Sequence, residues 1–127
     1  MEEHPESLLW SFCKKPEEMN AKFLFDAERM GDETSKKVLD AYFYYLGEGC
    51  LNFINAFRPE ALILGGGLIK QGPSFAKKLD DYLCEHGYGF GGTIAPKVDV
   101  LISSLGSEAG IYGAAALAFE KAKKREN

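Results

Sequence analysis

A short, wholly apolar run at 61–64 restricts the fold more than any other feature of the sequence. The run reads Ala-Leu-Ile-Leu, it follows Pro59 by two positions, and Gly65, Gly66 and Gly67 come directly after it. Four apolar residues bounded by turn-forming residues are typical of a buried strand in a parallel sheet. The sequence therefore predicts a buried, central strand over 61–64 that ends at a glycine turn.

A long helix is predicted immediately before this strand. Asp32 is a good helix cap, and Pro59 disfavours helical geometry in the residue ahead of it. The helix between them would run about 25 residues, or roughly 37 Å. Its apolar residues keep nearly helical spacing: Val38, Leu39, Tyr42, Leu46, Phe53, Ile54 and Phe57.

The remaining elements complete an alternating order. We expect short helices before residue 30, a helix from near Pro73, a second strand over 98–102 and a last, alanine-rich helix from near Ser107. Helices that alternate with strands indicate an α/β fold with parallel strands packed by long helices. We expect a single domain over 1–127, with a helical lead-in over 1–30 and a core over 31–122.

Composition excludes several classes of protein. A formal net charge of −4 disfavours a nucleic-acid-binding surface, which normally needs a basic patch. The three cysteines form no C-x-x-C pair, so no zinc site or disulfide framework is indicated. No apolar run reaches the ~20 residues that span a bilayer, and the acidic start Met1-Glu2-Glu3-His4 does not resemble a signal peptide. We therefore expect a cytoplasmic protein without a membrane partner.

The glycine turn is the first candidate site. Three glycines remove every Cβ from the turn, so a flat ligand can approach the main chain closely. Open α/β sheets bind ligands at the carboxyl ends of their strands, where this turn would lie. The triplet is neither a G-x-G-x-x-G motif nor a P-loop, and the spacing of Lys70 does not suit a phosphate-binding lysine. On these residues alone, a tight turn without a ligand is equally compatible with the pattern.

A second glycine-rich segment runs over 106–115. Gly106, Gly110 and Gly113, with the neighbouring alanines, give a helix start with almost no side-chain bulk on one face. Such a helix can pack closely against another element, or it can pivot on that element as a domain hinge would. Glu108 lies in its first turn, where complementarity to the helix dipole explains it without a catalytic role.

Three blocks of this sequence together resemble the ROK family, which contains bacterial sugar kinases and related repressors. Residues 55–67 look like the family run N-x-x-x-P-E-x-I-x-x-G-G-G, and residues 105–115 resemble L-G-x-x-A-G-x-x-G-A-A. Gly31-Asp32 before the long helix is also similar to the family pattern. The three blocks come in the family's order over residues 26–119.

The resemblance implies the carboxy-terminal part of an actin-like, ribonuclease H-like ATPase domain. It implies that Gly65, Gly66, Gly67 and Leu68 lie against the adenosine of ATP, and that residues 106–115 lie at a hinge between lobes. The parent protein is then expected to phosphorylate a hexose, such as glucose, with ATP and Mg²⁺, and to form a homodimer.

Several family motifs are missing from this sequence. It contains no D-x-G-G-T phosphate loop, no N-x-D with a catalytic aspartate, and neither the H-E-x-G-H nor the C-x-C-G-x-x-G-C-x-E segment of the sugar and zinc sites. Phosphoryl transfer needs positioning and charge stabilisation around the γ-phosphate. We therefore assign no catalytic or metal-binding residue and expect no turnover by this chain alone.

Two other functions remain open. The chain can be a fragment of a sugar-responsive ROK repressor, whose helix-turn-helix would lie upstream. It can also be a dimerisation module, since exposed aromatic side chains are common at interfaces. The candidate aromatic residues are Tyr42, Tyr44, Tyr45 and Phe90, although those on the long helix also suit a core.

Overall fold

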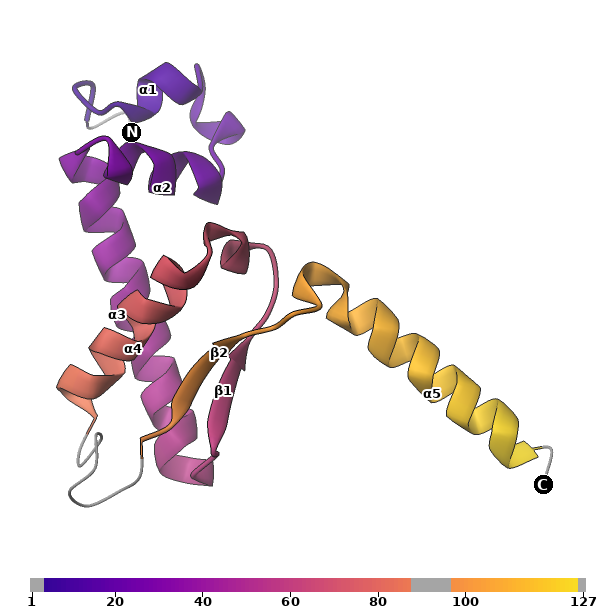
Figure 1. The fold of residues 1–127 in the computed structure, drawn as a ribbon. Coiled ribbons are helices and arrows are strands. Elements are labelled where there is room, and N and C mark those ends of the chain that lie inside the picture. The colour runs from indigo at the N-terminus through magenta and orange to yellow at the C-terminus, as the bar shows by residue number, and fades with distance from the viewer. Residues whose placement is uncertain (1–3, 88–96, 126–127) are drawn as a thin grey trace.

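The computed structural model describes residues 4–87 and 97–125 (Figure 1). Helices pack against one face of a small sheet, and the last helix extends away from them. The elements in chain order are α1 (Leu9–Phe12), the 3-10 turn η1 (Pro16–Glu18), α2 (Ala21–Arg29), α3 (Glu33–Phe57), β1 (Ala61–Leu64), η2 (Leu68–Gln71), α4 (Pro73–His86), β2 (Asp99–Ile102), η3 (Gly106–Glu108) and α5 (Ala109–Arg125).

Helix α3 confirms the predicted long helix. It contains 25 residues, and the Asp32 side chain caps it by accepting a hydrogen bond from the Ser35 backbone N–H. It ends at Arg58, whose φ of 48° places that residue in the left-handed region just before Pro59. The cap and the proline therefore set both ends, as the sequence predicts.

Asp32 also holds the start of the chain against α3. The Ser7 hydroxyl donates to Asp32 Oδ2 over 3.0 Å, and the Leu8 backbone N–H donates to Oδ1 over 2.7 Å. The Ser35 hydroxyl donates to Oδ2 over 2.7 Å. Only 7% of Asp32 is exposed, so a single buried carboxylate joins the segment before α1 to the start of α3.

The two strands form a parallel sheet, as predicted, but β1 is not a buried central strand. In the part of the chain that the structure describes, β1 pairs along one edge only, with β2, and Ile63 lies opposite Leu101. Leu62 and Leu64 pack on the core, whereas Ile63 is 69% exposed on the other face. A central, buried strand is paired along both edges and covered on both faces. Among the described residues, nothing pairs with the other edge of β1, and nothing covers the face that carries Ile63.

The core lies between α2, α3, α4 and the inner face of the sheet. Three aromatic rings meet at its centre, with centroid separations of 6.5 Å for Phe25 and Phe43, 6.1 Å for Phe25 and Phe75, and 5.2 Å for Phe43 and Phe75. Leu79 and Leu83 of α4 are fully buried and belong to the same core cluster. These contacts hold α4 across α3, with its first turn at the end of the sheet where the glycine turn lies.

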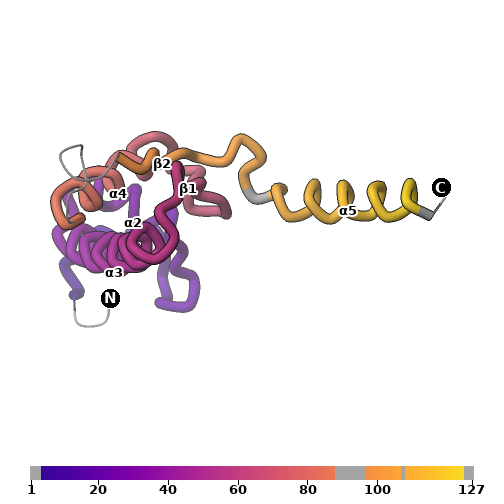
Figure 2. The backbone as a smooth tube through the Cα atoms, turned by 90° about the horizontal axis from the view of Figure 1, so that it is seen from below, coloured from indigo at the N-terminus to yellow at the C-terminus, as the bar shows by residue number. Residues whose placement is uncertain are grey.

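Helix α5 stands apart from this body. Figures 1 and 2 show it extending from η3 without a second element beside it. The predicted start near Ser107 is two residues early, because the turn η3 precedes the helix; the side chain of Ser107 lies outside the described residues. None of the helices in the described ranges has the length and apolar character needed to cross a membrane.

Candidate functional site

The glycine turn after β1 is open. Gly66 has a φ of +91°, a conformation that residues with a side chain rarely adopt. A Cβ atom placed on Gly65, Gly66 or Gly67 would meet no atom within 4 Å apart from those of the adjacent residues in the chain. The turn is therefore not packed beneath other side chains, and its main chain is accessible to a ligand.

A hollow of about 190 Å³ lies beside this turn. The turn contributes three of the four predicted residues, Gly65, Gly67 and Leu68, while Gly66 shapes the turn without lining the hollow. Its other lining residues are Tyr42, Leu46, Leu64, Ile69 and Phe75.

The chemistry of the hollow suits a flat apolar ring. None of its lining residues carries a charge at neutral pH. Burial raises the pKa of the Tyr42 hydroxyl, with the nearby Cys50 as a smaller cause, so the phenol stays neutral. The volume is below the ~300–1,000 Å³ of pockets that enclose a whole small molecule. The lining residues therefore form a small, uncharged site for a ring system, and none of them offers a cationic side chain for phosphates.

Sequence reasoning missed the walls that face the turn. Tyr42 and Leu46 come from α3, and Phe75 comes from the first turn of α4. The i, i+4 spacing of Tyr42 and Leu46 places both side chains on one side of α3, but spacing alone does not identify which element they face. The packing of α3 and α4 against each other and beside β1 brings these side chains to the glycine turn.

The glycines of the second glycine-rich segment are not closely packed within the described residues. Gly106 adopts a φ of +56° at the bend into η3. A Cβ atom on Gly110 or Gly113 would meet nothing within 4 Å. Close packing, one of the two predicted uses of this segment, is therefore not provided by the described part of the chain.

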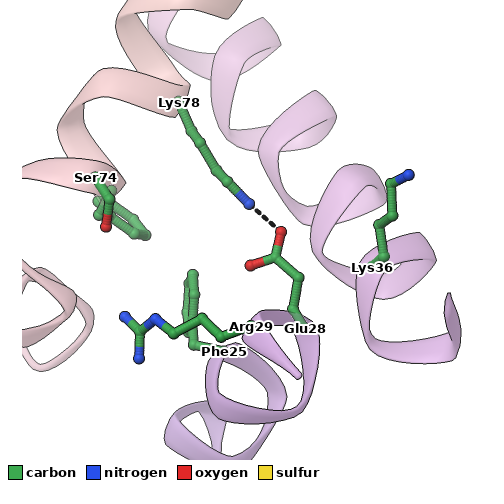
Figure 3. A pocket seen from close by; sticks show the side chains of 7 residues that line it. Phe25, Glu28, Arg29, Lys36, Ser74 and Lys78 are labelled. Atoms are coloured by element: carbon green, nitrogen blue, oxygen red, sulfur yellow. Dashed lines mark hydrogen bonds and ion pairs between the residues drawn. The ribbon is translucent and has the colours of Figure 1, made fainter. Parts of the chain in front are cut away.

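A second hollow, of about 380 Å³, lies between α2, α3 and α4 (Figure 3), and Phe75 lines both hollows. Two of the three cationic residues that line it are engaged within the chain: the Lys78 ammonium pairs with Glu28, and Arg29 donates to Gln71 over 3.1 Å. Lys36 points away from the pair of Lys78 and Glu28 in Figure 3. These contacts tie α2 to α4 and η2, so the hollow is explained by packing.

Metal ligands are not gathered anywhere in the described ranges. Across residues 4–87 and 97–125, no three His, Cys, Asp or Glu side chains come close enough together to hold a metal ion. Cys13 and Cys50 are buried, and Cys84 is exposed; all three are free thiols.

Comparison with known proteins gives one family. The model of the ROK family matches residues 6–121. A glucokinase of Thermotoga maritima is 34% identical over 119 residues, which cover 91% of this chain and 35% of the glucokinase. A glucokinase of Halalkalibacterium halodurans is 32% identical over 111 residues, covering 87% of this chain and 33% of that protein.

A repressor is also among the relatives. The xylose repressor of Bacillus spizizenii is 26% identical over 114 residues, which cover 90% of this chain and 29% of the repressor. The chain thus spans about a third of the length of the curated relatives it matches.

Proposed function

Because the chain belongs to the ROK family, we propose that it is the carboxy-terminal, nucleotide-binding part of a sugar kinase that transfers the γ-phosphate of ATP to a hexose such as glucose. The observation that carries this proposal is the open glycine turn with an uncharged hollow beside it, in a chain whose relatives include two glucokinases. A cytoplasmic location is part of the same proposal.

The chain's own contribution is to hold the adenosine. The Gly65 and Gly67 backbone supplies a flat surface, and the side chains of Tyr42, Leu46 and Phe75 enclose a ring placed against it. ATP supplies the transferred phosphoryl group. Neither a D-x-G-G-T loop nor an N-x-D motif occurs in the sequence, so the phosphates, Mg²⁺ and the sugar hydroxyl depend on other parts of the parent protein.

This division of labour is testable with the purified chain. Calorimetry with ATP is expected to show weak binding at most, because the sequence lacks the motifs that would hold the phosphates. A coupled glucose-phosphorylation assay is expected to show no turnover. Robust turnover by this chain would contradict the proposal.

Filling the hollow should abolish nucleotide binding without unfolding the chain. In Gly65→Leu, the new side chain would enter the space beside the turn, where a Cβ atom meets nothing within 4 Å. We expect ATP binding to fall at least tenfold, while the free energy of unfolding changes by only about 0.5 kcal/mol. Calorimetry and urea unfolding measure the two effects, with Gly49→Leu as the control at an open glycine that does not line the hollow. Unchanged ATP binding by Gly65→Leu would exclude the hollow as the site.

The similarity to a xylose repressor supports a second candidate, a fragment of a ROK transcriptional repressor. The reading frame of the parent protein separates the two candidates. A frame that encodes D-x-G-G-T and N-x-D supports the kinase. A frame that encodes a helix-turn-helix and lacks the aspartate supports the repressor.

A further inference from the structure

The short turn η2 joins the glycine turn to α4 and forms part of the hollow beside β1. Leu68 and Ile69 of η2 line this hollow, next to Gly67. A movement of η2 would therefore move lining residues of the candidate nucleotide site. The contacts that hold η2 in place thus bear directly on the shape of the site.

The backbone of η2 is too short to hold this shape alone. The turn contains four residues, and its hydrogen bonds run from the Lys70 N–H to the Gly67 carbonyl over 3.3 Å and from the Gly72 N–H to the Ile69 carbonyl over 2.9 Å. A 3-10 turn of this length has poor hydrogen-bond geometry and few bonds to offset the entropy of ordering it. Glycines flank it on both sides, with Gly72 at a φ of +81°, so contacts with other elements must fix its position.

Gln71, the last residue of η2, is held from two sides. Its main-chain carbonyl accepts a hydrogen bond from the Ser74 hydroxyl of α4 over 3.3 Å. Its side-chain carbonyl accepts one from Arg29 Nη2 of α2 over 3.1 Å, across 42 positions of sequence. Together with the buried side chain of Ile69, these bonds fix η2 between α2 and α4.

Arg29 is oriented for this contact by its own helix. Its Nη1 donates to Asp26 Oδ1 over 3.0 Å, one turn earlier in α2. Figure 3 shows the guanidinium pointing away from the pair of Lys78 and Glu28. Because the guanidinium is planar and its donors have fixed directions, the bond to Asp26 restricts where Nη2 can donate. The bond to Gln71 has a charged donor, which makes it stronger than a bond between neutral groups.

We propose that Arg29 is a positioning residue for the nucleotide site. Through Gln71 it holds η2, and with η2 the residues that line the hollow, in the conformation that receives the adenosine. This inference rests on the proposed function, since it assigns Arg29 to that same site. Arg29 is not among the residues that line the hollow beside the glycine turn, so it acts without touching the adenosine.

Hydrogen exchange of the amide protons, measured by NMR on the full chain without nucleotide, tests the hold on η2. Arg29→Met keeps the apolar stem and removes the donors, and it is expected to speed exchange of the Lys70 and Gly72 amides by about fivefold. Gln71→Met is expected to have the same effect. Gln71→Glu keeps an acceptor for Arg29 and is expected to exchange as the wild type does. Lys77→Met, which breaks an exposed ion pair within α4, is the matched control and is expected to change nothing at η2.

NMR titration with ADP tests the consequence for the site. Arg29→Met and Gln71→Met are each expected to weaken the Kd by about fivefold. The double variant is expected to bind no more weakly than either single variant, because both substitutions remove the same bond. Gln71→Met leaves the charge of Arg29 in place, so an equal loss in this variant distinguishes positioning from attraction of the phosphates. Circular dichroism checks that every variant is folded.

The outcomes separate this inference from the function on which it rests. Absence of ADP binding by the wild-type chain would overturn the proposed function and the role of Arg29 with it. Wild-type ADP binding that Arg29→Met leaves unchanged would overturn the inference alone. Unchanged amide exchange at η2 in Arg29→Met, or losses of affinity that add in the double variant, would also overturn it.

Discussion

Replacement of Asp32 by alanine is expected to lower the free energy of unfolding by about 3–4 kcal/mol, a large share of the stability of a small domain. The loss of a helix cap alone costs about 1 kcal/mol. The remainder, about 2–3 kcal/mol, comes from three donors left without their acceptor, each at or below the low end of about 1–3 kcal/mol for an unsatisfied group, because one of them is only partly buried. Those donors are the Ser7 hydroxyl, the Leu8 N–H and the Ser35 hydroxyl.

Urea unfolding followed by far-UV circular dichroism measures this effect. Asp40→Ala is the matched control, because Asp40 is an exposed aspartate on the same helix. We expect the control to change stability by no more than about 0.5 kcal/mol. Equal effects of the two substitutions would show that Asp32 does not hold the lead-in to α3.

The same carboxylate makes stability depend on pH. Burial acts to raise the pKa of Asp32, but hydrogen bonds from Ser35, Leu8 and Ser7 outweigh it and hold the pKa below its ordinary value. A lowered folded-state pKa stabilises the protein above the unfolded pKa of about 4, and this stabilisation is lost as the pH falls through the folded pKa. The stability difference between the wild type and Asp32→Asn is therefore expected to narrow below about pH 4. A difference that stays constant down to low pH would contradict the role of the charge.

The second large effect is expected at Gly47 of α3, which faces the Tyr82 ring of α4. A Cβ atom on Gly47 would lie 2.1 Å from Cδ1 and 2.4 Å from Cε1 of Tyr82. The ring cannot move freely, because its hydroxyl donates to Glu48 over 2.8 Å and its face stacks on His86 at 4.1 Å. Burial, together with this hydrogen bond, raises the pKa of Tyr82 to about 12, so the donor is present at neutral pH.

Gly47→Ala is therefore expected to destabilise the chain by about 2 kcal/mol. Overpacking costs up to about 3 kcal/mol, and the better helix propensity of alanine returns about 1 kcal/mol. Gly49→Ala is the control on the same helix, because a Cβ atom there meets nothing within 4 Å. We expect this control to gain about 1 kcal/mol.

A double substitution identifies the cause. In a Tyr82→Ala background the obstructing ring is gone, and Gly47→Ala is expected to become stabilising. Urea unfolding of the wild type, the two single variants and the double variant gives the coupling free energy between positions 47 and 82. If Gly47→Ala destabilises equally with and without the Tyr82 ring, close packing of the two helices is not the reason for the glycine.

The elements set by local chemistry could be predicted from the sequence. Asp32 and Pro59 give both ends of α3, and the apolar run before the three glycines gives β1 with its residues correctly assigned. Caps, prolines and periodicity act within a few residues of themselves, so a single sequence is enough to read them.

Features that depend on distant contacts could not be predicted. The pattern of β1 indicates an apolar strand, but it does not show that Ile63 faces a surface left uncovered in the described chain. The bonds from Ser7 and Leu8 to Asp32 join residues 25 and 24 positions apart, and no local pattern marks them. The aromatic residues predicted for an interface also differ in their surroundings. Tyr42 packs against the core, whereas Tyr44 is 51% exposed and Tyr45 is 74% exposed. Phe90 lies outside the described residues.

The candidate site falls between these two cases. The glycine turn is visible in the sequence because only glycine provides its conformation and accessibility. The side chains that enclose the hollow, Tyr42, Leu46 and Phe75, come from two helices, and their meeting depends on how α3 and α4 pack.

Amide NMR of the labelled chain during titration with ADP tests the central claim most directly. If the adenine ring binds against the glycine turn at 65–67, saturable chemical-shift changes are expected at the amides of Gly65, Gly67 and Leu68 and near Phe75. Shifts confined to the hollow around Lys78 and Arg29, or the absence of saturable shifts at the glycine turn, would contradict the account.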